Sequence, residues 1–384
     1  MKRCMIWSMA SCGWEFRFGI SARSAPVQTF KVQGFKAGTT ERSFQSFKTF
    51  KPFKTYSDLR SVAMNFMKSL LLLVFVGSLY GSSGFAQTTN LRIAFNGYGG
   101  TVPLFLGQDA GIFKKQNLQL EMIFIPGGSL SLQVLIGKSL ELLLTGGPPV
   151  VNAAQQGAKI KIIGGATNLL PYTFVATGGI RGPEQLKGKR IGISRFGSNT
   201  EYVVRLALNQ FALTASDVQI LQVGGSQARL LAMNSGAIAA TVLSPEESLV
   251  AQKMGYGVLL DFIEKGIEFP HVNIVARDDY LEGQGAVVRA FMRAYVESVR
   301  YYKANRNDAI KKIMAVTKLP ERQMAETVYD GSLRATPDDG KPTLKGMEVV
   351  LDAAAKENPK AKAITVQQLV DLRYFQKAIT DLGE

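Results

Sequence analysis

The chain has 384 residues, with 45 Lys and Arg against 30 Asp and Glu, one His and two Cys. Residues 1–86 hold both Cys, twelve of the basic residues and three of the acidic ones, which leaves residues 87–384 with 33 basic and 27 acidic residues and a net charge of +6. Without Cys, that part has no disulfide, thiol nucleophile or thiolate metal site. We therefore expect no metal, no cofactor and no catalytic residue, and the length suggests two domains.

A secretory signal peptide is predicted at residues 64–86. It begins with a basic segment, continues with an apolar run and ends in small residues at Ala86. The apolar segment at 70–80 is shorter than the roughly twenty residues that a membrane span needs. No Cys lies at the predicted cleavage site, so we expect no lipid anchor. The mature protein is expected to begin at Gln87 and to be periplasmic.

Residues 1–63 contain repeated Phe-Lys pairs. Basic residues with interleaved aromatics are able to bind nucleic acid, which is one interpretation. The other is that a signal peptide must lie at the true N-terminus, so 1–63 is a spurious or disordered leader. We adopt the second interpretation and expect no nucleic-acid partner.

The mature chain opens with alternating strands and helices. Strands are predicted at 91–95, 118–125, 140–144 and 160–164. Helices are predicted at 101–113, with Thr101 as the cap, 129–136 and 150–156. Strands separated by helices of this length pair in parallel through right-handed crossovers, which indicates an α/β lobe.

The same alternation continues after an extended segment at 172–177. Further strands are predicted at 190–194, 218–223 and 237–243, and further helices at 200–211, 226–234 and 245–254. Residues 272–276 form an extended segment that crosses back to the first lobe. The remainder is helical, around 308–317, 320–330, 344–357 and 365–380, after a helix whose apolar stripe should pack on the first lobe: Val288, Phe291, Tyr295, Val299 and Tyr302.

Several segments in this order resemble one family. They are Ala-Gly-Ile-Phe at 110–113, Leu-Lys-Gly-Lys-Arg-Ile-Gly-Ile at 186–193, Gly-Ser at 197–198, and Val-Arg-Ala-Phe at 288–291 followed by Asn-Asp-Ala at 307–309. Their spacing over 91–380 is similar to that of the SsuA-like family, the periplasmic substrate-binding proteins of ABC importers for nitrate, sulfonates, taurine and thiamine-pyrimidine precursors.

The resemblance implies an α/β fold of the periplasmic binding protein type II class, with two α/β lobes joined by two crossing strands. The first lobe would be 87–175 plus 273–384 and the second 178–270. The protein would be a monomer that closes by a hinge around a small molecule and then docks on an ABC permease in the inner membrane.

Two alternatives to transport remain open. The same receptor would serve equally well as a ligand sensor for a signalling partner. The superfamily also contains a thiamine-pyrimidine synthase, which depends on iron and a Cys-rich motif. Because residues 87–384 lack Cys, we expect a binding protein that is not an enzyme.

The ligand site is predicted from the strand ends. In open α/β sheets, ligands bind where the carboxyl ends of strands turn into helices. This rule selects loops at 98–101, 127–129, 145–147, 195–200, 224–226 and 244–246. The predicted ligand-binding residues on them are Tyr98, Gly99, Thr101, Gly128, Ser129, Thr145, Gly146, Arg195, Phe196, Gly197, Ser198, Asn199, Thr200, Ser226 and Glu246.

The loop at 194–200 is the most specific of these. It leads from a strand into a helix, so free N–H groups and the helix dipole favour an anionic group there. Arg195 would add a bidentate contact and Phe196 an apolar wall. The alternatives are that Arg195 is solvated and that Ser198 and Glu201 form a capping box.

Other side chains carry weaker expectations. Ser244 and Glu247 have capping-box spacing, so Glu246 is the residue free to meet a ligand amine or to pair with Arg195. Tyr98 is expected to be a stacking lid, and His271 a structural residue near the hinge. The ligand is therefore expected to be anionic or a planar organic molecule.

Overall fold

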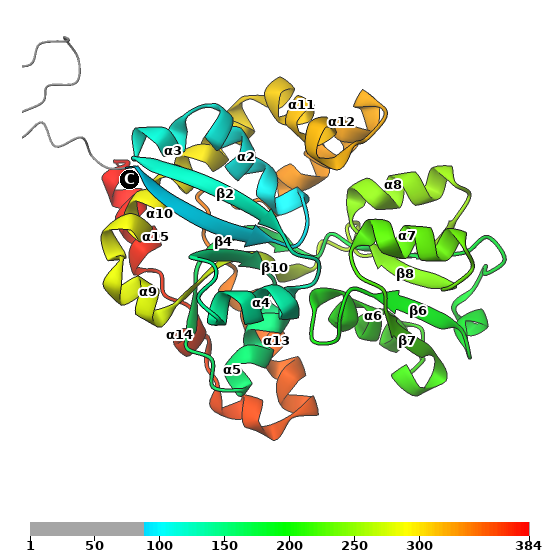
Figure 1. The fold of residues 1–384 in the computed structure, drawn as a ribbon. Coiled ribbons are helices and arrows are strands. Elements are labelled where there is room, and N and C mark those ends of the chain that lie inside the picture. Colours follow the sequence, from blue (N-terminus) through cyan, green and yellow to red (C-terminus); the bar gives the residue numbers. More distant parts are fainter. Residues whose placement is uncertain (1–87, 384) are drawn as a thin grey trace, which may run out of the picture. The chain divides into compact units, whose positions relative to one another are not determined.

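A computed structural model describes residues 88–383 (Figure 1). The predicted leader at 1–63 and the predicted signal peptide at 64–86 lie outside the described residues. Within the described part, the strands form two separate five-stranded sheets. We call each sheet with its flanking helices a lobe.

The first sheet has the strand order β2-β1-β3-β10-β4. Its strands are β1 (Thr89–Phe95), β2 (Leu118–Phe124), β3 (Leu142–Thr145), β4 (Ile160–Leu169) and β10 (Glu268–Arg277). β1 pairs in parallel with β2 and β3, as predicted. The prediction is wrong for β4, because the antiparallel strand β10 lies between β3 and β4 and pairs with both.

The second sheet repeats this pattern, with the order β7-β6-β8-β5-β9. Its strands are β5 (Thr173–Ala176), β6 (Arg190–Ile193), β7 (Gln219–Gln222), β8 (Ala240–Leu243) and β9 (Gly257–Asp261). β6 is parallel to β7 and β8, whereas β5 is antiparallel to β8 and β9. The sequence did not predict β9.

The chain crosses between the sheets twice, at residues 170–172 and 262–267. The two crossings are hydrogen-bonded to each other: Leu170 N donates to Ile267 O at 2.9 Å, and Phe262 N donates to Tyr172 O at 3.0 Å. Because β5 belongs to the second sheet and β10 to the first, the crossings lie a few residues before the predicted lobe boundaries at 175 and 273.

Helices follow the strands in each lobe (Figure 1). In the first lobe they are α2 (Val102–Asp109), α3 (Ile112–Lys115), α4 (Gly128–Ile136) and α5 (Gly147–Gln155). In the second they are α6 (Asn199–Gln210), α7 (Ser226–Asn234) and α8 (Pro245–Lys253). After β10 come α9 (Asp278–Gly283), α10 (Gly285–Ala304), α11 (Arg306–Thr317), α12 (Arg322–Ala335), α13 (Leu344–Glu357), α14 (Val366–Leu369) and α15 (Arg373–Asp381).

Two predicted helices are interrupted. The helix expected at 101–113 breaks at Gly111, whose φ of +72° is a left-handed conformation that glycine adopts without strain. Thr101 does not cap α2, because its hydroxyl donates back to Gly97 O. The helix expected at 365–380 is divided into α14 and α15.

The buried side chains explain how the helices attach. The predicted stripe on α10 is confirmed: Val288, Phe291, Tyr295 and Val299 are buried against β1, α2 and α15, and Tyr302 is buried among α2, α11 and α12. A larger cluster starts on the other face of the first sheet and continues through the first crossing into the second sheet. The apolar core therefore spans both lobes on one side.

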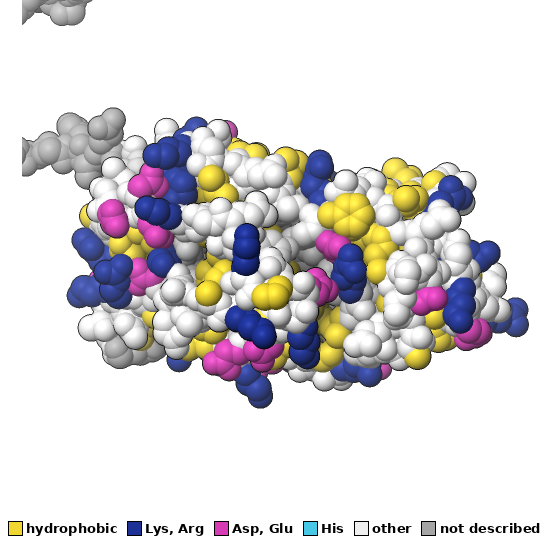
Figure 2. Space-filling view, turned by 90° about the horizontal axis from the view of Figure 1, so that it is seen from below, with side chains coloured by type: hydrophobic (Ala, Val, Ile, Leu, Met, Phe, Trp, Pro, Cys, Tyr) yellow, Lys and Arg dark blue, Asp and Glu magenta, His cyan; other side chains and the backbone are white. Residues whose placement is uncertain are grey.

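None of the helices in the described part of the chain is both long and apolar enough to cross a membrane. Figure 2 shows one face, on which Lys and Arg side chains are interspersed with Asp and Glu. On that face, therefore, the positive charge is not gathered into a single patch.

Candidate ligand-binding site

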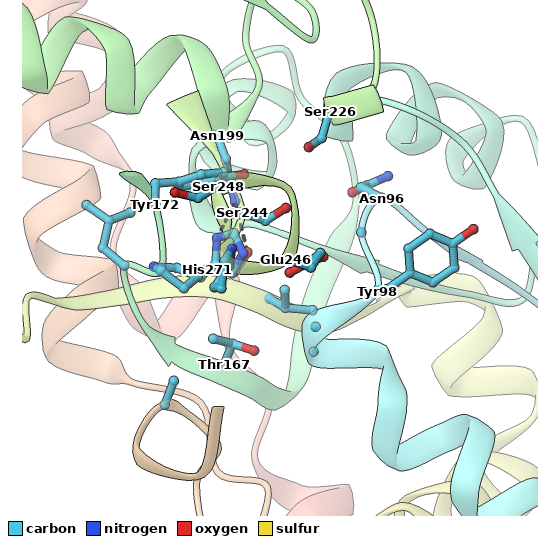
Figure 3. A pocket seen from close by; sticks show the side chains of 18 of the residues that line it. Asn96, Tyr98, Thr167, Tyr172, Asn199, Ser226, Ser244, Glu246, Ser248 and His271 are labelled. Carbon is cyan, nitrogen blue, oxygen red and sulfur yellow. Dashed lines mark hydrogen bonds between the residues drawn. The ribbon is translucent and has the colours of Figure 1, made fainter. Parts of the chain in front are cut away.

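A cavity of about 290 Å³ lies between the two sheets (Figure 3). It is bounded by the loops that follow β1, β3, β6 and β8, and by the first crossing. Strand-end loops of both lobes therefore meet at one space, as the rule for open α/β sheets predicts.

Eleven of the fifteen predicted ligand-binding residues line this cavity: Tyr98, Gly99, Thr101, Gly128, Thr145, Gly146, Ser198, Asn199, Thr200, Ser226 and Glu246. Thr101, Thr145 and Glu246 are almost completely buried. Four predicted residues do not line it, namely Ser129, Arg195, Phe196 and Gly197. Ligand contact by the eleven remains a prediction.

The four excluded residues lie where the lobes touch. Ser129 Oγ donates to Phe196 O at 3.0 Å, and the Phe196 side chain is 48% exposed, so it is no wall of the cavity. The Arg195 side chain packs over Gly127, and its Nε is buried without a hydrogen-bond partner among the described residues. These residues join one lobe to the other.

Two N–H groups of the loop at 194–200 are bonded to neighbouring side chains. Phe196 N donates to Gln222 Oε1 at 2.9 Å, and Gly197 N donates to Glu201 Oε2 at 2.5 Å. The predicted capping box is also absent, because the Ser198 hydroxyl donates to Arg195 O and bonds the hydroxyls of Ser194 and Thr200. The N–H groups of Phe196 and Gly197 are therefore occupied, and anion binding by the rest of the loop remains a prediction.

Tyr98 lines the cavity but is not free to act as a lid. Its ring is stacked on Phe124 at the end of β2, with centroids 5.7 Å apart and an interplanar angle of 3°. Phe95 contacts it edge-on. The neighbouring aromatic residues hold the Tyr98 ring at the cavity margin. The glycines around Tyr98 in the sequence gave no indication of these contacts.

His271 and Asn199 connect the lobes at the back of the cavity. Asn199, at the start of α6, donates through Nδ2 to His271 O on β10 at 2.9 Å, and the same nitrogen lies 3.3 Å from His271 Nδ1. Burial lowers the pKa of His271 to about 3, so the imidazole is neutral at ordinary pH. His271, expected to be only structural, lines the cavity.

Glu246 is the most perturbed carboxyl in the cavity. It lies in the first turn of α8 and is 3% exposed, and its Oε2 has no hydrogen-bond partner among the described residues. Burial, together with the neighbouring Glu247 carboxyl, raises the pKa of Glu246 to about 8. The predicted cap at Ser244 is absent, because Ser244 Oγ donates to the Glu247 carboxylate and not to the backbone.

Arg229 on α7 was missed by sequence reasoning. It lines the cavity and is 1% exposed. Its guanidinium donates to Thr241 Oγ1, Gly224 O, Ser226 Oγ and Val242 O at 2.6–3.1 Å. Arg229 thus fixes the 224–226 loop and orients Ser226, and it does so without a carboxylate partner in the described part of the chain.

A family model described as NMT1/THI5 like matches residues 100–309, more than half of the chain. The chain belongs to the NMT1/THI5-like family. Among relatives, the taurine-binding periplasmic protein of Escherichia coli (strain K12) is 26% identical over 308 residues, which cover 76% of this chain and 94% of that protein.

Solved structures show the same fold. A protein from Bordetella bronchiseptica RB50 has a TM-score of 0.70 at 20% identity, covering 77% of this chain and 98% of its own. The alkanesulfonate-binding protein SsuA from Xanthomonas axonopodis pv. citri, bound to MOPS, has a TM-score of 0.63 at 20% identity, with 75% and 99% covered. The predicted periplasmic binding protein fold is confirmed.

In this member of the family, α12 adds a further wall to the cavity. Thr327, Gly331, Ser332 and Arg334 line it, although they follow the first loop by more than 200 residues. Lys253 on α8 and Glu321, just before α12, form an ion pair on the same side. No strand–turn–helix pattern marks α12, so sequence reasoning had no signal for it.

Proposed function

We propose that this chain is the substrate-binding protein of an ABC-type importer. It captures a small organic molecule in the cavity between its lobes, acts outside the cytoplasm as a monomer, and delivers the molecule to a membrane permease. It performs no chemistry on its ligand.

One observation carries the proposal: strand-end loops of two separately built sheets enclose a cavity of about 290 Å³. A cavity of this size, with a few polar groups directed into it, suits a small molecule. The lobes touch beside it through Ser129 and Phe196 and through Asn199 and His271. A hinge motion of the lobes about the two crossings would break these contacts, and the open cavity would then admit or release a ligand.

Family membership supports the same function. Two of the proteins named above are a taurine-binding and an alkanesulfonate-binding protein, so small, polar organic molecules are among the first candidates. The aromatic residues that line the cavity, Tyr98 and Tyr172, favour an organic ligand over a bare inorganic ion.

A thermal-shift screen of the purified protein tests the capture step. The panel should contain sulfonates, amino acids, aminopyrimidines, aromatic carboxylates and nitrate. A true ligand at a hundred times its dissociation constant adds about 2.7 kcal/mol of stability. The absence of any stabilising compound across all classes would count against a receptor function.

Delivery is tested separately with the permease and its ATPase in proteoliposomes. The liganded protein should stimulate ATP hydrolysis and ligand uptake, and the unliganded protein should not. A protein that binds its ligand tightly but leaves the transporter unaffected would instead be a sensor for a signalling partner.

A further inference from the structure

We infer that the ligand carries a protonated nitrogen, as an ammonium or amidinium group, and that Glu246 binds it. This inference rests on the proposed function and names the ligand class of the same cavity. It develops the sequence-based expectation that Glu246 is free to meet a ligand amine, and it differs from the expectation of an anion held at the 194–200 loop.

The first support is the position of Glu246. Its side chain is 3% exposed, lines the cavity (Figure 3), and leaves Oε2 without a hydrogen-bond partner among the described residues. A buried carboxyl oxygen without a hydrogen-bond partner is costly, and a donor on a ligand is one explanation for such an atom in a binding cavity. A ligand N–H group directed at this oxygen would satisfy it.

The second support is that no basic side chain within the described residues pairs with Glu246. Arg195, the partner suggested by the sequence, lies outside the cavity and packs over Gly127. Arg229 is committed to four oxygen acceptors, none of them on Glu246. Neither arginine therefore pairs with the buried Glu246 carboxyl, and a cationic group of the ligand would be able to do so.

The charges around Glu246 determine its protonation. Burial raises the pKa of Glu246, and the carboxyl of Glu247, also on α8, raises it further. Burial raises the pKa of Glu247 as well. Arg229 on α7 lowers the pKa of Glu247, and Tyr172 on the first crossing is neutral because burial raises its pKa to about 12. The remaining charged side chains that line the cavity are Asp261 and Arg334, and His271 is neutral.

These surroundings set different requirements for an oxyanion and for an ammonium group beside Glu246. An anion would face a carboxyl pair and would require it to keep its proton, whereas an ammonium group would replace that proton and form a buried, charge-assisted hydrogen bond. The two ligand classes therefore couple to protons with opposite sign. Binding of an ammonium ligand releases a proton from Glu246, and its affinity rises as the pH approaches about 8. The affinity then levels off while the amine stays protonated.

Matched compounds that differ by one amino group provide the direct test. We would titrate the purified protein with taurine against ethanesulfonate and with β-alanine against propionate, because both amino compounds carry an ammonium group at pH 7. At least one nitrogen-bearing member should bind, and its partner should bind at least tenfold more weakly. Calorimetry at pH 7 in buffers of different ionisation enthalpy should show close to one proton released.

The variant Glu246→Gln keeps the shape and removes the charge. It should weaken the nitrogen-bearing ligand by about tenfold to a hundredfold, the range for a hydrogen bond between charged groups, and abolish proton release. Glu282→Gln is the matched control, because Glu282 is exposed on α9, away from the cavity. It should retain both affinity and proton release.

The outcomes separate the two proposals. If the compound without the amino group binds as tightly as its amino partner, and its affinity falls as the pH rises, the assignment of Glu246 to a ligand ammonium group is overturned and the receptor function stands. Tight binding of nitrate with the same pH dependence would have the same meaning. If nothing in any class binds, the receptor function itself fails. Because the matched pairs are compared on the natural protein, the result does not depend on whether Glu246→Gln folds.

Discussion

Glu246 and His271 contribute two opposing pH dependences to the stability of the protein without ligand. Burial lowers the pKa of His271 from 6.5 to about 3, so the unfolded chain takes up a proton first as the pH falls, and stability is lost between 6.5 and 3. The pKa of Glu246 is raised from 4.5 to about 8, so the unfolded chain releases its proton first, and stability is lost as pH rises from 4.5 to 8. Between 4.5 and 6.5 the two dependences offset each other.

We therefore predict that Glu246→Gln removes the loss of stability on the alkaline side. At 1.36 kcal/mol for each pKa unit, the variant should be more stable than the natural protein by roughly 2–4 kcal/mol at pH 8 without ligand, and nearly equal at pH 4. Urea unfolding between pH 4 and 9 measures this. Parallel profiles for the two proteins would show that Glu246 does not hold the proton.

Gly146 is a second residue whose substitution has a defined result. A Cβ there would lie 1.8 Å from Asn199 Oδ1, and the Asn199 amide is held by its bond to His271 O. Gly146→Ala should therefore separate the lobes and weaken the ligand found by screening about tenfold, since overpacking costs about 1–3 kcal/mol. Gly179→Ala, where nothing lies within 4 Å, is the control. Equal affinities for both variants would contradict the importance of the Asn199 contact.

Among the elements, α12 offers a test that separates the fold from the site. Gly331 lies inside this helix, lines the cavity, and has nothing within 4 Å of a Cβ position. Gly331→Ala should raise stability by about 0.5–1 kcal/mol because glycine is a poor helix former. Gly331→Phe should fold but block the ligand, which thermal shift with and without ligand would show. Unimpaired binding by the Phe variant would remove α12 from the site.

The elements also show what the sequence was able to predict. The loops after β1, β3, β6 and β8 were found because a strand followed by a turn and a helix leaves a regular pattern. Which side chain of a loop enters the cavity was not predictable: Ser198 and Phe196 differ by two residues, yet one is buried in the site and the other is exposed. Arg229 gave no signal, because an arginine inside a polar helix usually faces solvent.

At the scale of the whole molecule, the interlobe contacts define a closed arrangement. Ser129 meets Phe196, Asn199 meets His271, and Lys253 meets Glu321. Apolar contacts also join the lobes, since Tyr202 on α6 is stacked on Phe269 of β10 and one core cluster spans both sheets. The polar contacts are partly exposed, so they should be the first to open without a ligand. X-ray scattering should then give a larger radius of gyration for the empty protein, which contracts at saturation with ligand. Identical dimensions in both states would argue against a hinge.

The two crossings have a consequence for biosynthesis. Every strand of the second sheet lies within residues 173–261, and the ends of this stretch are hydrogen-bonded to one another through Tyr172 and Phe262. The first sheet begins earlier but is completed later, since β4 joins it only through β10. During synthesis from the N-terminus, all strands of the second sheet are therefore available before β10 is made. The second lobe is able to fold first, and the first lobe folds only after β10 has been added.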